Sequence, residues 1–284
     1  MPALTGLRTV GTSADRSADK HALLRALATS ELNIVRARFG HLYRGHLLID
    51  LTAGDAAGDG ESLWWRASSP AIFAYIAAKY TLIRVRLYEI EKDTFDRLIE
   101  NLSRRLPEMG FELQYRWRWV HRDTRSTIDA IKGDSRSIED YGDMQLRMFA
   151  LVSNDPNSVH SWAMNMETLA KARGPATSMT TMGCNAHSLK RAVPLENRGP
   201  WFERLEAAIA LAQAKDSYDV RLMRRVADFG QFAYLIIAPR NRIFPLIDGM
   251  VTLSWRDHPR EFEQTITELF YSKSEMADGH RWRV

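Results

Sequence analysis

The stretch that decides the fold is His46-Leu47-Leu48-Ile49-Asp50-Leu51, a short apolar run that carries a carboxylate and leads into a loop with glycines at positions 54, 58 and 60. An apolar run of this length before a glycine loop predicts a buried strand. Ser69-Pro70 then gives an N-cap and first-turn signal for a helix through Lys79. Residues 83–89 predict a second strand. This order of elements is typical of half of a dinucleotide-type domain.

The same alternation continues along the chain. Asp93 can cap a helix whose apolar positions follow the i, i+3, i+4, i+7 spacing of one buried face, at Phe95, Leu98, Ile99 and Leu102. Further elements are predicted as a helix beginning near Ala18, parallel strands at 127–131, 147–153 and 177–182, a helix at 201–214 and a late buried strand at 232–238.

These elements predict an α/β fold with a doubly wound, mostly parallel Rossmann-like sheet, helices on both faces and an antiparallel late strand. Residues 1–17 are predicted to form a flexible tail and residues 18–284 a single domain. A basic and aromatic strand is predicted as an insertion at residues 111–125.

The composition limits the class of protein. A hydrophobic share of 45% and a charged share of 26% are ordinary for a globular chain, and its apolar runs are too short to cross a bilayer. With no secretory signal at the N-terminus, we expect a soluble cytoplasmic protein. The lone Cys184 excludes an internal disulfide and a cysteine-rich zinc site, and the histidines show no paired ligand spacing, so no metal is expected.

The glycine loop carries the first candidate ligand site. In open α/β sheets the ligand lies at the carboxyl ends of the strands, where glycines let backbone N–H groups come close to it. No Gly-Lys-Ser/Thr follows, and acids in and beside the loop would repel a pyrophosphate but suit the ammonium and sulfonium charges of S-adenosylmethionine. The predicted cofactor contacts in this segment are Asp50, Thr52, Ala53, Gly54, Asp55 and Gly58.

Two acids after the next strands extend this site. Glu89 stands where a carboxylate can accept hydrogen bonds from both hydroxyls of a ribose, with Glu91 as the nearby competitor. Asp134 could contact an adenine amino group, with Asp123 as its rival if the strand lies further upstream.

The segment Asn154-Asp155-Pro156-Asn157 follows the fourth predicted strand. Its amide and carboxylate oxygens could accept hydrogen bonds from a nucleophilic amine and align its lone pair with the methyl group to be transferred. Asn154, Asp155 and Asn157 are therefore the candidate catalytic residues, and Asp155 is also a candidate cofactor contact. The alternative is a simple Asp-Pro turn that closes the strand.

Arginines alternate with aromatic residues between Tyr115 and Arg125. This pattern suits phosphate contact together with base stacking, which makes Arg116, Arg118 and Arg122 candidate nucleic-acid contacts. The alternative is an antiparallel strand over residues 112–122, with aromatics on one face and solvated arginines on the other. Both can hold. The net charge of +4 permits a polyanionic partner without demanding one.

Together these residues resemble the Rossmann-like methyltransferase superfamily, whose first four motifs would correspond to residues 50–60, Glu89, Gly133-Asp134 and Asp155-Pro156. Within it the chain is most similar to the three-Cys-motif partner proteins and related phage-type sequences. That narrower resemblance rests on Asp50-Leu51-Thr52-Ala53-Gly54, Ser68-Ser69-Pro70, Asp155-Pro156-Asn157-Ser158, Gly183-Cys184-Asn185 and Leu189-Lys190-Arg191. It implies a cofactor-binding methyltransferase fold and a nucleic-acid context, and adds Lys190 and Arg191 to the candidate nucleic-acid contacts.

Three functions stay open at this point. The first is methyl transfer from S-adenosylmethionine to a nucleic-acid base or nucleotide, with DNA favoured over RNA. The second keeps the cofactor but moves another group or acts on a small molecule. The third is a non-catalytic module that pairs with another protein. Asn157 and Ser158 stand where amino-methylating enzymes of nucleic acids usually have a second proline and an aromatic residue.

Overall fold

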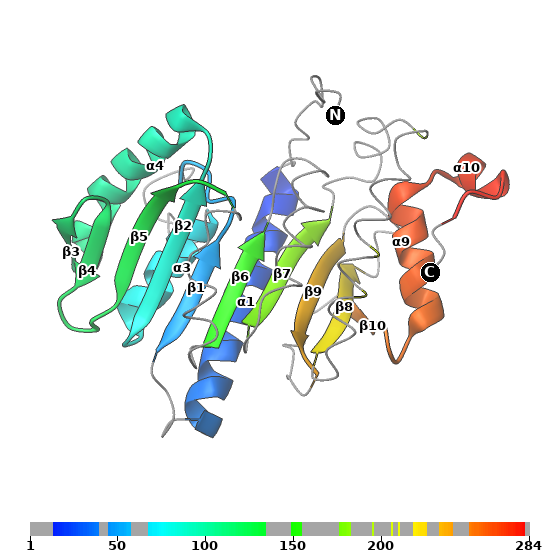
Figure 1. Cartoon of the computed structure of the whole chain (residues 1–284), viewed down its shortest axis with the longest axis horizontal. Helices are drawn as coiled ribbons and strands as arrows, with labels where there is room; N and C mark the ends of the chain where they lie inside the picture. Colours follow the sequence, from blue (N-terminus) through cyan, green and yellow to red (C-terminus); the bar gives the residue numbers. More distant parts are fainter. Residues whose placement is uncertain are drawn as a thin grey trace.

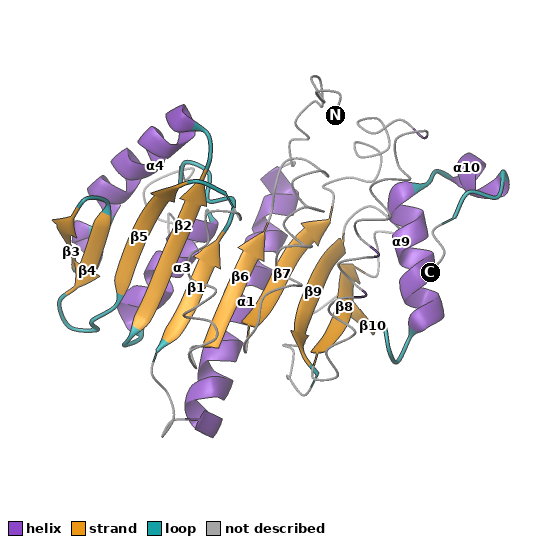
Figure 2. Ribbon diagram, viewed as in Figure 1, coloured by secondary structure: helices purple, strands orange, loops and turns teal. Residues whose placement is uncertain are grey.

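The computed structural model describes residues 14–39, 45–57, 68–134, 149–154, 176–182, 195, 206, 210, 218–225, 233–240 and 250–281. In this part of the chain, strands form one sheet in the order β10-β8-β9-β7-β6-β1-β2-β5-β4-β3. Helices pack along the sheet, as Figures 1 and 2 show.

The centre of the sheet is parallel. Its five strands are β5 (Thr127–Lys132), β2 (Ile83–Glu89), β1 (His46–Asp50), β6 (Phe149–Asn154) and β7 (Ala176–Met182). Each pairs with its neighbours in this series in parallel. The chain order reverses between β1 and β6, so the carboxyl ends of these two strands flank the switch point at which doubly wound folds bind ligands. The predicted fold class is confirmed.

Antiparallel strands extend the sheet beyond β7. The predicted late strand is β9 (Ala233–Pro239), which lies between β7 and β8 (Tyr218–Arg225) and is antiparallel to both. β10 (Met250–Ser254) pairs with β8 at the edge. Sequence reasoning missed β8 and β10. In β8 the adjacent residues Asp219 and Val220 are both buried, as are Leu222 and Met223, which breaks the polar–apolar alternation that marks a half-exposed strand.

The inserted basic and aromatic segment forms a hairpin instead of one strand. β3 (Phe111–Tyr115) and β4 (Arg118–His121) pair antiparallel, and β4 pairs antiparallel with β5. The two-residue turn contains Trp117 at a φ of 63°, the left-handed region that costs a bulky residue about 1–2 kcal/mol. Because this turn has neither Gly, Asn nor Pro, it carries no sequence signal for a chain reversal.

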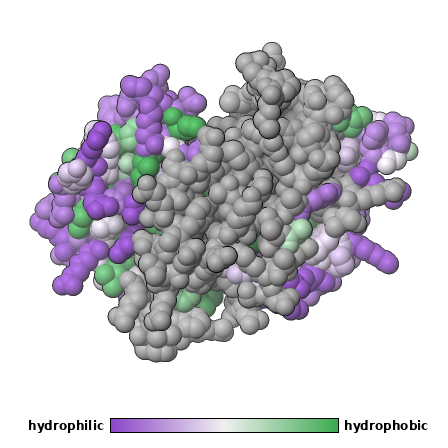
Figure 3. Space-filling view, in the orientation of Figure 1, coloured by the Kyte–Doolittle hydropathy of each residue, from purple (hydrophilic) through white to green (hydrophobic). Residues whose placement is uncertain are grey.

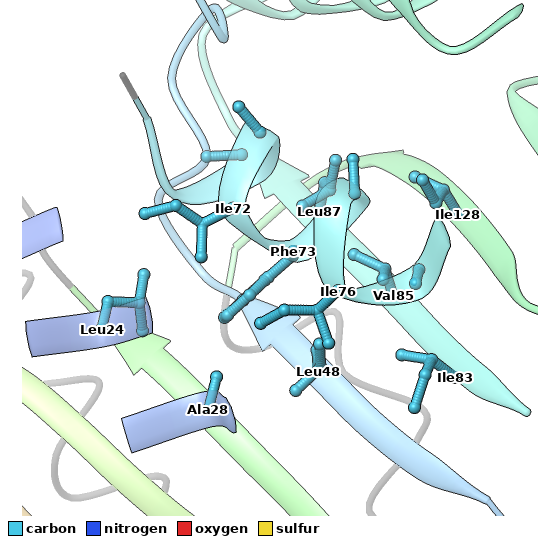
Figure 4. Close-up of a cluster of buried hydrophobic side chains, with 14 of the residues drawn as sticks. Leu24, Ala28, Leu48, Ile72, Phe73, Ile76, Ile83, Val85, Leu87 and Ile128 are labelled. Atoms are coloured by element: carbon cyan, nitrogen blue, oxygen red, sulfur yellow. The ribbon is translucent and has the colours of Figure 1, made fainter. Parts of the chain in front are cut away.

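Three helices cover one face of the sheet: α1 (Ala14–Phe39), α3 (Ser69–Lys79) and α4 (Lys92–Arg105). Figure 4 shows the core between them and the strands, where Phe73 and Ile76 of α3 meet Leu48 and Val85. Phe73 is fully buried, and burial of such a side chain contributes about 1.5–3 kcal/mol.

The helix starts differ slightly from prediction. Ser68, rather than Ser69, caps α3 by accepting a hydrogen bond from the backbone N–H of Ala71. Asp93 lies in the first turn of α4, which begins at Lys92 without a side-chain cap. The predicted buried face of α4 is confirmed. α1 begins at Ala14 instead of near residue 18.

The remaining described elements are the short 3-10 helix η3 (Pro107–Met109) and the C-terminal helices α9 (Pro259–Phe270) and α10 (Lys273–Ala277). The helix predicted at 201–214 lies outside the described residues except at 206 and 210. Among the helices that the structure describes, none combines the length and apolar character needed to cross a membrane.

Candidate functional site

Three predicted site residues lie side by side along the edge of the sheet that is formed by the carboxyl ends of its central strands. Asp50 ends β1, Glu89 ends β2 and Asn154 ends β6. Asp50 pairs in register with Leu87 on one side and Ser153 on the other, which places these ends next to one another. All three polar side chains are buried, with 9% exposure at Glu89 and none at the other two.

The Glu89 carboxylate joins the loop after β1 to the end of β2. Its Oε2 accepts a hydrogen bond from the backbone N–H of Gly54 at 3.0 Å, and its Oε1 accepts one from the backbone N–H of Glu91 at 2.9 Å. A carboxylate has about four lone-pair sites, so each oxygen can still accept a further hydrogen bond from a ligand. Glu91 itself is exposed. Burial and contacts therefore favour Glu89 over this competitor.

The loop that follows β1 is held by its backbone N–H groups, which donate hydrogen bonds to the Asp50 side chain and to β2. The N–H of Thr52 donates to Asp50 Oδ1 at 3.1 Å, and the N–H of Ala53 donates to the carbonyl of Tyr88 at 3.0 Å. Gly54 has a φ of 64°, and a Cβ added there would meet nothing within 4 Å. Open space beside a left-handed glycine is what close approach of a ligand to the backbone requires.

Asp55 contacts helix α4 instead of the strand ends. Its Oδ2 lies 3.5 Å from Nε of Arg97, and its backbone carbonyl accepts a hydrogen bond from Nδ2 of Asn101 at 2.8 Å. Its Oδ1 also accepts from the backbone N–H of Ala57 at 2.9 Å. These contacts fasten the glycine loop to α4. Sequence reasoning missed these contacts of Arg97 and Asn101, since their four-residue spacing is ordinary for a solvated helix face.

The structure separates the two candidates for the third acid. Asp134 follows the carboxyl end of β5, and the backbone N–H of Gly133 donates to the carbonyl of Glu89 at 3.0 Å. Asp123 precedes β5, at the opposite edge of the sheet, where its backbone N–H donates to Nδ1 of His121. Asp134 is thus the acid beside the site.

Other predicted residues fall where the structure gives no description. Gly58, Asp155, Asn157, Lys190 and Arg191 all lie outside the described residues. Within the described ranges no group of histidine, cysteine and acidic side chains is arranged to hold a metal ion.

Two of the three arginines predicted in the hairpin are engaged in ion pairs. Arg118 makes two hydrogen bonds to the carboxylate of Asp129, which also lies 3.3 Å from Nε of Arg86. Nε of Arg122 lies 2.9 Å from Oε1 of Glu112. Arg116 sits in the exposed turn. The basic character of the hairpin is therefore partly neutralised by Glu112 of β3 and Asp129 of β5.

No protein-family model and no curated protein matches the chain. Solved structures with a similar arrangement include the methyltransferase domain of bacterial CtHen1, which is 11% identical with a TM-score of 0.41 over 78% of this chain and 99% of that chain. A predicted O-methyltransferase, protein Atu636 from Agrobacterium tumefaciens, is 11% identical with a TM-score of 0.40 over 78% and 81%. The human methyltransferase 10 domain containing protein is 11% identical with a TM-score of 0.35 over 75% and 82%.

These sequence identities and TM-scores are too low to assign a function, and the similarities concern the arrangement of strands alone. The strand order, with β9 antiparallel beside β7, is consistent with a Rossmann-like methyltransferase fold. The narrower resemblance to three-Cys-motif partner proteins stays a prediction.

Proposed function

We propose that this chain binds S-adenosylmethionine at the carboxyl ends of β1, β2 and β5 and transfers its methyl group to a nucleic-acid base or nucleotide, with DNA favoured over RNA. The observation that carries the proposal is the buried Glu89 carboxylate, held by two backbone N–H groups beside the open Gly54 loop. This is the position from which a carboxylate contacts ribose hydroxyls in doubly wound folds.

The charges at this edge support a cationic ligand. Asp50, Glu89 and Asp134 end or follow three neighbouring parallel strands. Three carboxyl groups disfavour a pyrophosphate and favour the ammonium and sulfonium groups of the methyl donor. Gly54 leaves room beside the backbone for such a ligand to approach. The residues present therefore fit the proposed cofactor.

Each group would have a distinct task. Glu89 would accept hydrogen bonds from the two ribose hydroxyls, and Asp134 would accept one from the adenine amino group. Asn154, with Asp155 and Asn157 after it, would accept hydrogen bonds from the amine of the substrate and orient its lone pair. When bound, S-adenosylmethionine supplies the electrophilic methyl group. Catalysis by these residues is then mainly orientation of the nucleophile.

A Glu89→Gln variant tests the assignment of the ribose contact. A glutamine at this position presents an NH2 donor in place of one carboxylate oxygen and has no negative charge, so the charge-assisted hydrogen bonds to the ligand are lost. Its NH2 group would also oppose one of the two backbone N–H groups that donate to Glu89. Loss of about 1.5–3 kcal/mol corresponds to an affinity for S-adenosylhomocysteine about 10-fold to 150-fold weaker. Calorimetric titration measures this change.

Glu91→Gln is the matched control, because Glu91 has the same charge two residues away but is exposed. The affinity of the Glu91→Gln variant for S-adenosylhomocysteine should equal that of the unaltered chain. Equal affinities for all three proteins would show that Glu89 does not contact the cofactor.

The transfer itself is tested by mass spectrometry of DNA and RNA nucleosides from cells with and without expression of the chain. The proposal predicts one additional methylated nucleoside, which Glu89→Gln reduces and Glu91→Gln does not. If S-adenosylhomocysteine binds but no nucleoside changes, the substrate is not a nucleic acid.

A further inference from the structure

The tip of the β3–β4 hairpin exposes aromatic side chains that the proposed site does not use. Tyr115 is 74% exposed and Trp117 is 39% exposed, on either side of the exposed Arg116. Within the same hairpin the aromatic rings of Phe111 and Trp119 are buried. Core packing therefore explains only the second pair of aromatic residues. Figure 3 shows that the described surface on the side of the hairpin is otherwise mainly hydrophilic.

The hairpin tip lies on the side of the sheet formed by the carboxyl ends of the parallel strands, as the candidate cofactor site does. β4 runs antiparallel to β5, with Arg118 opposite Asp129, and the carbonyl of Trp117 accepts a hydrogen bond from the backbone N–H of Ala130 at 3.0 Å. β5 then continues to Lys132, which pairs with Glu89. Figure 1 shows the turn between β3 and β4 at the end of the sheet to which the β2 and β5 arrows point.

The backbone at Trp117 is strained. Its φ of 63° is a conformation that glycine or asparagine adopts readily and that a bulky residue rarely adopts. A tryptophan at a strained and solvent-exposed position indicates that the side chain serves a purpose other than folding.

The exposed basic groups near this tip can contact a polyanion at only a few points. Residues 111–125 contain four arginines and two acids, and the exposed side chains at the edge include Arg116 and Lys132. Because Arg118 and Arg122 are engaged in ion pairs, the remaining basic groups supply few phosphate contacts. Binding must then depend largely on the rings. Aromatic stacking needs bases whose faces are free, which single strands have and duplexes lack.

We propose that Tyr115 and Trp117 form a stacking platform for unpaired bases of a single-stranded nucleic acid, with Arg116 contacting a backbone phosphate. The inference rests on the nucleic-acid substrate of the proposed function and narrows it to a single strand or an unpaired region. It also moves the main binding role from the predicted arginines to the aromatic residues between them.

The test is the affinity of the full chain for a fluorescently labelled single-stranded DNA oligonucleotide, measured by anisotropy without cofactor. Trp117→Gly removes the ring and relieves the backbone strain, so the variant keeps its fold. Loss of one stacked base should weaken binding by about tenfold. Tyr115→Leu, which keeps an apolar side chain but removes the ring, should weaken it similarly.

Leu113→Ala is the matched control, because Leu113 is 55% exposed on β3 but has no ring to stack. Its affinity for the oligonucleotide should stay within about twofold of the unaltered chain, since no stacking is lost. A labelled duplex of the same sequence should bind more weakly than the single strand. Equal binding by Trp117→Gly, Tyr115→Leu and the unaltered chain would overturn the platform, and so would equal weakening by Leu113→Ala.

Titration with S-adenosylhomocysteine distinguishes this inference from the proposed function. If the ring variants lose oligonucleotide binding while the chain binds no S-adenosylhomocysteine, the platform stands and the methyltransferase assignment fails. If the chain binds S-adenosylhomocysteine but no oligonucleotide, the platform is overturned and the hairpin surface is left to a protein partner.

Discussion

We expect the Trp119→Ala variant to lose about 3–5 kcal/mol of unfolding free energy, the range for truncation of a large aromatic side chain in a core. Trp119 is 1% exposed and lies on β4 opposite Leu113 on one side and Ile128 on the other. Its ring belongs to the main core cluster, so alanine leaves a cavity that the surrounding strands can only partly fill. Urea denaturation followed by circular dichroism measures the change.

Trp117→Ala is the matched control for this prediction. It removes the same side chain two residues away, where 39% of the residue is exposed. We expect a change within about 1 kcal/mol, as for most surface positions. Equal losses for the two tryptophans would contradict the placement of Trp119 in the core and of Trp117 at the exposed turn.

The second large effect is expected at Asp129, whose carboxylate is shared by Arg118 and Arg86. Asp129 is 6% exposed. Its replacement by alanine leaves two guanidinium groups close together without their anion, and removal of one partner of a buried pair costs about 3–5 kcal/mol. Because the Arg118 side chain is 47% exposed and keeps part of its hydration, we expect a loss near the lower limit, about 3 kcal/mol.

Glu112→Ala provides the comparison for Asp129→Ala. It breaks the ion pair with Arg122, in which both side chains are more than half exposed. Exposed pairs contribute about 0–1 kcal/mol, so denaturation should show a much smaller loss. A loss for Asp129→Ala no greater than that for Glu112→Ala would mean that the arginine pair does not need its carboxylate.

The sequence predicted the parallel centre of the sheet because β1 and β6 are buried along almost their whole length. β1 and β6 are largely apolar, whereas β5 has Asp129 between its apolar residues; each of the three strands begins and ends within two residues of its prediction. Of the antiparallel strands, β8 was missed because adjacent buried residues such as Leu222 and Met223 break the alternation of polar and apolar residues that marks a half-exposed strand. The β3–β4 turn was missed for a related reason: Trp117 occupies a turn position where glycine is the usual signal.

The candidate site was predictable where it depends on strand ends and not where it depends on the tertiary contacts of side chains. Asp50 and Glu89 follow from the position at which each strand stops. The contact of Asp55 with Arg97 and Asn101 joins segments more than 40 residues apart, and no local pattern announces it. The pairing of Arg118 with Asp129 likewise depends on a hairpin that was not foreseen.

The measurement that tests the central claim most directly is calorimetric titration of the unaltered chain with S-adenosylhomocysteine and, separately, with NAD. The acids Asp50, Glu89 and Asp134 around the Gly54 loop predict saturable binding of S-adenosylhomocysteine at one site per chain and no comparable binding of NAD, whose pyrophosphate they repel. Binding of NAD alone, or of neither compound, would contradict a methyl-donor site at these strand ends.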